Sequence, residues 1–182
     1  MARVPYLTED DATDENREAL SRNINLYRAV GHCAGGATNF SRIGLWLRFD
    51  SKFDPRLREL GILTVGYVTR AKYEWAQHVG LGYQFGVTDA DLDRLKLELD
   101  GTATDLPEIE RNIILGAAEM TRGTAMSQAR WDALAAHFNH ELMVELTMAI
   151  GFYVGLVRVL ETLQIDLDDD VVKHLERHPL LQ

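Results

Sequence analysis

The stretch that decides the fold is Leu57–Leu95, which reads LRELGILTVGYVTRAKYEWAQHVGLGYQFGVTDADLDRL. It holds two apolar segments with helical spacing, separated by a plausible break over Thr69–Lys72. The first segment follows Asp54 and Pro55, and an N-cap residue followed by proline is a favoured start for a helix. The second ends near Gly86, which suits a left-handed C-terminal cap. The stretch therefore predicts a helical hairpin.

Helix signals continue on both sides of this hairpin. Thr13 can cap a helix that runs to about Val30, and Thr88 can cap the helix that begins with TDADLDRL. Strand signals are weak, because no segment alternates apolar and polar residues over a sustained length. We expect an all-α single domain of seven or eight helices. Its expected parts are a less regular helical extension over 1–50, a core over 54–163 and an appendage over 164–182. Within the extension, the glycine-rich GHCAGGATNF predicts a mobile connection or a close backbone approach.

Composition and charge exclude several classes of function. The 182 residues carry a formal net charge of -9 and no basic run, which argues against a nucleic-acid partner. The most apolar stretch, LMVELTMAIGFYVGLVRVL, contains Glu145 and Arg158, so we expect a buried core helix and no membrane span. The first residues contain no long apolar run, and the single Cys33 cannot pair within the chain. The expected location is therefore the cytoplasm.

A carboxylate and an imidazole, Glu74 and His78, lie four residues apart on the second helix of the hairpin. At this spacing their Cβ atoms are about 6 Å apart, and the carboxylate raises the pKa of the histidine. A histidine tuned in this way is a candidate general acid. Glu59, on the first helix, can reach across the hairpin, and Arg70 is a candidate to bind a substrate anion. Trp75 is expected in the core and is also a candidate substrate contact.

The alternative is that the Glu74–His78 pair has no catalytic role: the two side chains are solvated, or they pair with each other and serve the structure only. A metal site is not predicted, because the pattern His-Glu-x-x-His is absent and one glutamate with one histidine supplies too few ligands. One cysteine also excludes a cysteine-based zinc site. We expect neither a metal nor an organic cofactor.

The Leu57–Leu95 stretch resembles the signature region of the carboxymuconolactone decarboxylase family, whose fold is shared with alkylhydroperoxidase D-like proteins. The similarity consists of Arg-Glu-Leu on a buried helix, a short break, Glu-Trp-x-x-His and a Gly-Val turn before TDADLDRL. It is clear over about residues 54–98 and extends more weakly to about Leu163. The resemblance implies an all-α fold and a homo-oligomer, either a trimer or a hexamer.

The resemblance also implies which branch of the family is relevant. In the peroxidase branch a Cys-x-x-Cys pair precedes the histidine. Counting back from His78, those two positions hold Ala71 and Glu74, while Glu59 matches an upstream glutamate. Thiolate chemistry requires the sulfur, so dithiol peroxidase activity is not expected. The decarboxylase branch instead carries Glu-x-x-x-His, as this sequence does.

The activity that this branch implies is that of a cofactor-independent lyase or related acid–base enzyme acting on a small carboxylate or lactone. His78 would donate a proton, and Glu74 would tune it or act as the base. Glu59 would orient the pair, and Arg70 would bind the substrate carboxylate. Two other hypotheses stay open: a non-catalytic small-molecule-binding or assembly protein on the same scaffold, and a peroxidase-like redox enzyme without the dithiol.

Overall fold

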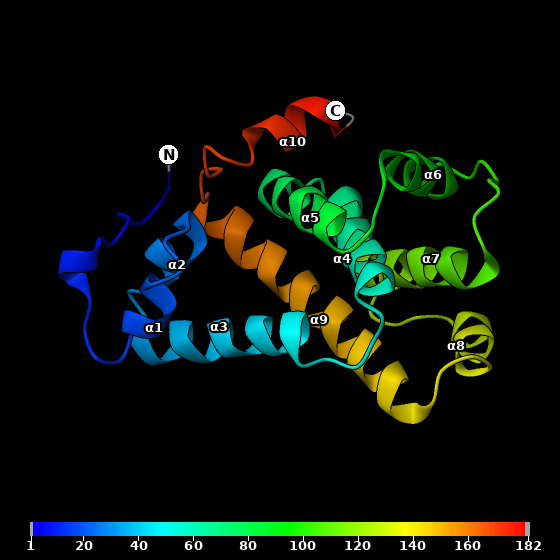
Figure 1. The fold of residues 1–182 in the computed structure, drawn as a ribbon, viewed down its shortest axis with the longest axis horizontal. Helices are drawn as coiled ribbons and strands as arrows, with labels where there is room; N and C mark the ends of the chain where they lie inside the picture. Colours follow the sequence, from blue (N-terminus) through cyan, green and yellow to red (C-terminus); the bar gives the residue numbers. More distant parts are fainter. Residues whose placement is uncertain (1, 181–182) are drawn as a thin grey trace.

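The structure, a computed structural model, describes residues 2–180 and is all-α, as predicted. Within that range it has ten α-helices, seven of them with seven residues or more (Figure 1). The prediction of seven or eight helices falls short of ten because three helices have only four to six residues. After a 3-10 turn at Glu9–Asp11, the helices are α1 Arg17–Leu20, α2 Asn25–Val30, α3 Ala34–Phe49, α4 Pro55–Thr69, α5 Lys72–Gln84, α6 Asp89–Leu99, α7 Glu108–Arg122, α8 Gln128–Ala135, α9 His140–Leu163 and α10 Val172–Arg177.

Helix α4 is the centre of the fold, and it packs against α5, α7 and α9. It starts as predicted, because the Asp54 side chain accepts a hydrogen bond from the Leu57 backbone N–H at 2.9 Å. It ends at Arg70, whose φ of 57° is left-handed and turns the chain back into α5. The two helices approach closely at Gly66, where an added Cβ would lie 3.2 Å from the backbone nitrogen of Trp75. The predicted hairpin is therefore present.

The first fifty residues are more regular than predicted. The expected helix over Thr13–Val30 is wrong, because Asn23 has a left-handed φ of 47° and separates α1 from α2. The prediction of a mobile connection in GHCAGGATNF is also wrong, because α3 begins at Ala34 and continues through it. Buried Ala37 and Leu47 anchor α3 in the core, and this packing outweighs the poor helix propensity of the glycines.

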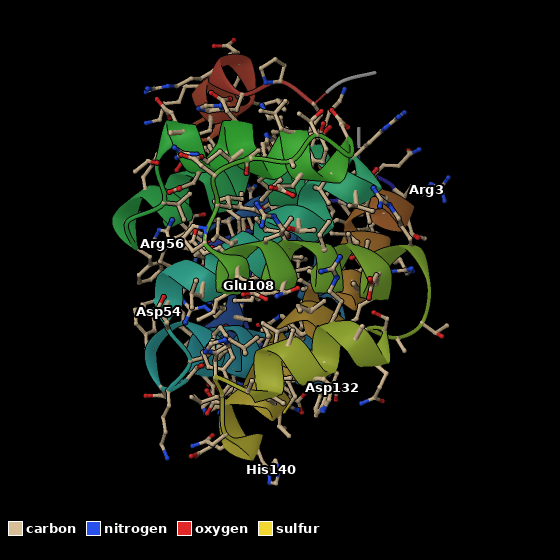
Figure 2. All side chains as sticks on the ribbon, turned by 90° about the vertical axis from the view of Figure 1, so that its right-hand side faces the viewer. Arg3, Asp54, Arg56, Glu108, Asp132 and His140 are labelled. Carbon is tan, nitrogen blue, oxygen red and sulfur yellow. The ribbon has the colours of Figure 1, made fainter. Side chains whose placement is uncertain are left out.

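Ion pairs hold the outer helices to the centre. Figure 2 looks onto α7 and α8, with Arg56 and Glu108 among the labelled side chains on this face. The Arg56 guanidinium lies 2.8 Å from Glu110 of α7 and 3.0 Å from Asp91 of α6. Thr88 caps α6 as predicted, through a capping box with Asp91. These contacts fix the start of α4, on which the candidate site depends.

Helix α9 is long and apolar enough to cross a membrane by length and composition, and 44% of its most apolar window is buried within the chain. The core helix of a globular protein passes the same test. Glu145 in α9 is buried and accepts hydrogen bonds from the Ser51 hydroxyl at 2.7 Å and the Phe53 backbone N–H at 2.9 Å. The inner face of α9 thus packs on α4, and its buried carboxylate has structural partners.

Candidate functional site

Three titratable side chains, Glu59, Glu74 and His78, converge between α4 and α5. Nδ1 of His78 lies 2.6 Å from Oε2 of Glu59, and its Nε2 lies 2.9 Å from Oε1 of Glu74. The imidazole is therefore held between two carboxylates, and no more than 6% of any of the three side chains is exposed. Helical spacing places Glu74 one turn before His78, and the hairpin brings Glu59 from the neighbouring helix.

The two carboxylates contact His78 in different ways. The contact with Glu59 is a hydrogen bond. The contact with Glu74 is an ion pair of similar length through Oε1. No group in residues 2–180 donates a hydrogen bond to Oε2, the second oxygen of this carboxylate. Glu74 is thus paired with His78 through one oxygen and keeps acceptor capacity on the other.

The charges explain the protonation of the site. Burial lowers the pKa of His78, but the charges of Glu74 and Glu59 outweigh burial and raise this pKa to about 9. Burial raises the pKa of Glu59, but His78 and Arg58 hold it below its usual range. Arg58 is buried, lies 3.3 Å from Glu59 and donates to the Leu47 carbonyl at 2.7 Å. At neutral pH, His78 is an imidazolium that Glu59 and Arg58 hold in place.

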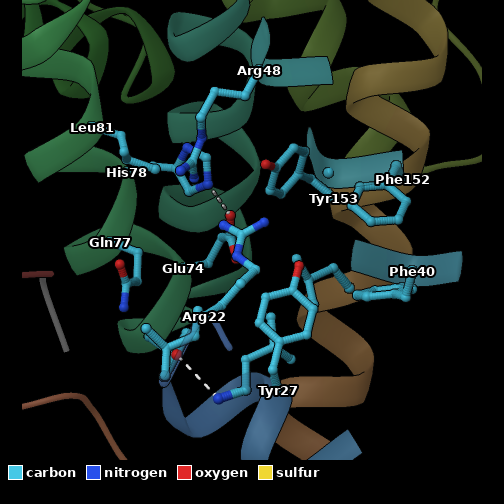
Figure 3. Close-up of a pocket in the computed structure, with 15 residues that line it drawn as sticks. Arg22, Tyr27, Phe40, Arg48, Glu74, Gln77, His78, Leu81, Phe152 and Tyr153 are labelled. Carbon is cyan, nitrogen blue, oxygen red and sulfur yellow. Dashed lines mark hydrogen bonds and ion pairs between the residues drawn. The ribbon is translucent and has the colours of Figure 1, made fainter. Parts of the chain in front are cut away.

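Glu74 and His78 line a cavity of about 50 Å³, which is shown in Figure 3. That volume has room for about four water molecules. The Tyr153 ring packs edge-on against the His78 ring, with centroids 4.7 Å apart. Burial, together with the charges of Glu74 and Glu59, raises the pKa of Tyr153 well above its usual value, so its phenol is neutral. The site is therefore small, enclosed by aromatic rings and next to a fixed cation.

Two arginines that the sequence analysis did not select also line the cavity. In Figure 3, Arg48 enters from the top and Arg22 from below. Both are half-buried, and neither has a carboxylate partner among residues 2–180. The Arg22 guanidinium lies over the Tyr27 ring, 4.8 Å from its centroid. Because Glu74 and His78 form an ion pair, these two guanidinium groups make the cavity positive and favour an anion.

The two substrate-binding candidates, Arg70 and Trp75, lie elsewhere. Arg70 is exposed at the end of α4 and lines a separate surface hollow with Lys72 and Glu161. Trp75 is fully buried, and its indole N–H donates to the backbone carbonyl of His178 at 2.6 Å. Neither side chain lines the cavity beside His78.

The remaining reactive groups do not join the site. Cys33 is exposed at the start of α3, and the neighbouring His32 ring lies 2.9 Å from the Pro5 carbonyl oxygen. In the described part of the chain, no group of three or more His, Cys, Asp and Glu side chains is arranged to hold a metal ion. The cavity beside His78 thus combines a buried histidine, a buried glutamate and two arginines, whereas no histidine in residues 2–180 lines the surface hollow at Arg70.

Comparison with known proteins gives one family match. Residues 36–99 match the model described as Carboxymuconolactone decarboxylase family. This segment extends from α3 to the end of α6 and contains Glu59, Glu74 and His78. No curated protein matches the chain.

Solved structures match over nearly the whole chain. An uncharacterized peroxidase-related protein from Ralstonia eutropha with an alkylhydroperoxidase AhpD core is 16% identical, with a TM-score of 0.79, covering 93% of this chain and 94% of the other. A variant of the debrominase Bmp8 in complex with 2,3,4-tribromopyrrole is 14% identical, with a TM-score of 0.77 and 97% of both chains covered. An uncharacterized peroxidase-related protein from a Silicibacter species is 16% identical, with a TM-score of 0.63, covering 94% of this chain and 97% of the other. At these identities the similarity shows a shared fold.

Proposed function

Because residues 36–99 of this chain belong to the carboxymuconolactone decarboxylase family and its fold is alkylhydroperoxidase D-like, we propose that it is an acid–base enzyme of the lyase type acting on a small organic acid. One observation carries the proposal. A buried imidazolium, His78, is paired with Glu74 at a cavity that two arginines without carboxylate partners make positive. Such a cavity can bind a carboxylate and hold a proton donor beside it.

The roles follow from position. Arg22 and Arg48 bind the carboxylate of the substrate, since guanidinium groups match its geometry. His78 supplies the proton, and Glu74, which is paired with His78 and also lines the cavity, passes the proton or receives it. Glu59 and Arg58 fix the ring. The cavity favours the smallest acids, because its volume of about 50 Å³ is well below that of a typical ligand pocket.

In the proposed decarboxylation step, the substrate itself accepts the electron pair that carbon dioxide leaves behind. The bond between the carboxylate carbon and its neighbour breaks, and carbon dioxide leaves. The electron pair moves into a conjugated carbonyl group to give an enolate. The enolate carbon then takes one proton from the His78–Glu74 pair, and solvent restores that proton. The protein contributes a bound anion, a sheltered site and one proton.

The anion-binding roles can be measured without knowing the substrate. Arg22→Gln and Arg48→Gln are each expected to raise the dissociation constant of acetate about tenfold, because each removes a charge-assisted hydrogen bond. Titration followed by NMR measures the constant. Arg70→Gln is the matched control and should leave it unchanged, since Arg70 lies outside the cavity. Equal weakening by all three substitutions would contradict the assignment.

We also propose a homo-oligomer, as the family resemblance implies. The support is an exposed apolar face on α3 and α9, which contains Ile43, Phe49, Val144 and Met148 at 42%, 68%, 53% and 50% exposure. Monomeric proteins rarely leave a large contiguous apolar patch in water. On the same helix, the Gly151 position is open, because a Cβ there would meet nothing within 4 Å. A second helix can approach α9 closely at this point.

Charging this face is expected to dissociate the oligomer. Met148→Lys places a cation in the proposed interface and should lower the mass measured by light scattering to that of a smaller species. Ala135→Lys, an exposed change on α8, should leave the mass unchanged. A wild-type protein that is a stable monomer at micromolar concentration would refute the assembly proposal.

A further inference from the structure

Within the part of the chain that the structure describes, one oxygen of the buried Glu74 carboxylate, Oε2, lacks a hydrogen-bond donor. Glu74 is 2% exposed; its Oε1 lies 2.9 Å from Nε2 of His78, and no group in the range 2–180 donates a hydrogen bond to Oε2. Buried polar groups are nearly always hydrogen-bonded, and leaving one unsatisfied is costly. Since Glu74 lines the cavity, its missing donor can come from a bound molecule. We propose that the ligand is a short anion that carries its own hydrogen-bond donor, as a two- or three-carbon hydroxy acid does. This inference rests on the proposed function.

Neighbouring donors on α5 are already used. The Tyr73 hydroxyl donates to Oδ2 of Asp168 at 2.6 Å, and the Gln77 amide donates to the same oxygen at 2.9 Å. Both side chains line the cavity, but the Tyr73 hydroxyl and one of the two N–H groups of Gln77 are directed to Asp168. The Nε2 of His78 contacts Oε1 of Glu74 at 2.9 Å, and Oε2 of Glu74 is left without a donor from residues 2–180. Glu74 thus keeps free acceptor capacity that nearby groups of its own helix do not fill.

The charge and volume of the cavity restrict the possible ligands further. Arg22 and Arg48 provide cationic donors for a carboxylate, and Glu74 provides an acceptor for a donor on the same molecule. A cavity of about 50 Å³ holds roughly four or five non-hydrogen atoms. Glycolate has the required size, one carboxylate and one hydroxyl, so it is a probe of binding; it lacks the conjugated carbonyl that the proposed decarboxylation requires. In this arrangement its hydroxyl proton faces Glu74.

The test compares anions that differ in the donor, using the full chain and calorimetry. Glycolate is expected to bind about tenfold or more tightly than acetate, which lacks the hydroxyl, and than methoxyacetate, which keeps the oxygen but lacks the proton. In Glu74→Gln the preference should fall below about threefold, while acetate binds at least as well, because a negative charge has gone. Glu141→Gln, an exposed change at the start of α9, should keep the preference.

Each result is decisive. Equal binding of glycolate, acetate and methoxyacetate to the wild-type protein overturns this inference and leaves the proposed anion site standing. Failure of all three to bind overturns the anion site of the proposed function as well. An unchanged preference in folded Glu74→Gln, checked by thermal unfolding, also overturns the inference. If that variant does not fold, the comparison of the three anions on the wild-type protein still decides.

Discussion

Replacing His78 with glutamine is expected to lower turnover of a carboxylate substrate by about 10²–10⁴-fold and to reduce the free energy of unfolding by about 3–5 kcal/mol. The first effect follows because His78 is the only imidazole that lines the cavity. The second follows because its removal leaves Glu59 and Glu74 as two buried carboxylates without the cation between them. No other substitution at the site removes both the proton donor and the charge balance.

Urea unfolding at pH 7 and assays with short carboxylates and carboxylated lactones measure the two effects. The matched control is His32→Gln, because His32 is exposed and lies outside the cavity. The stability gap should narrow as the pH falls, because the unpaired carboxylates can then be protonated and lose their charge. Turnover that is unchanged in a folded His78→Gln protein would remove His78 from the mechanism.

The stability of the wild-type protein is expected to fall by about 3 kcal/mol as the pH rises from about 6.5 to about 9. The pKa of His78 is raised in the folded state from 6.5 to about 9, so the folded state binds this proton more tightly than the unfolded state. The stabilisation is therefore complete below pH 6.5 and is lost as the pH rises through the folded-state pKa. His78 is buried, so solvent screens the effect little.

Urea midpoints taken across this range measure the loss, and His78→Gln is the control. The variant lacks the titrating group, so its stability should change little over the same range. An equal decline in both proteins would assign the pH dependence to other groups and would contradict the pairing of His78 with Glu59 and Glu74.

Helical spacing and turn signals in the sequence predicted the three converging residues, but they did not predict the other residues that line the cavity. Spacing alone places Glu74 and His78 on one helix face, and a two-residue break folds α4 against α5 so that Glu59 meets His78. Arg22 and Arg48 reach the cavity through the packing of the N-terminal helices, and no spacing rule relates them to His78. The one signal was the position of Arg48 in the otherwise apolar run GLWLRF.

Simple physical reasons explain why the two candidates for substrate binding lie outside the cavity. Trp75 follows Glu74 directly, and one step along a helix turns the side chain by about 100°. Its ring therefore points into the core beside α6 instead of the cavity. Arg70 occupies the left-handed residue that ends α4, where its side chain projects to solvent. Adjacency in a sequence pattern does not place a side chain at the site.

The measurement that tests the account most directly is the titration of His78 by ¹⁵N NMR, with and without a saturating short carboxylate. An imidazolium held between Glu59 and Glu74 should titrate with a pKa of about 9, and the bound anion should shift its ring resonances. A pKa near the ordinary 6.5, with resonances indifferent to the anion, would show that the ring neither bridges the carboxylates nor faces a ligand.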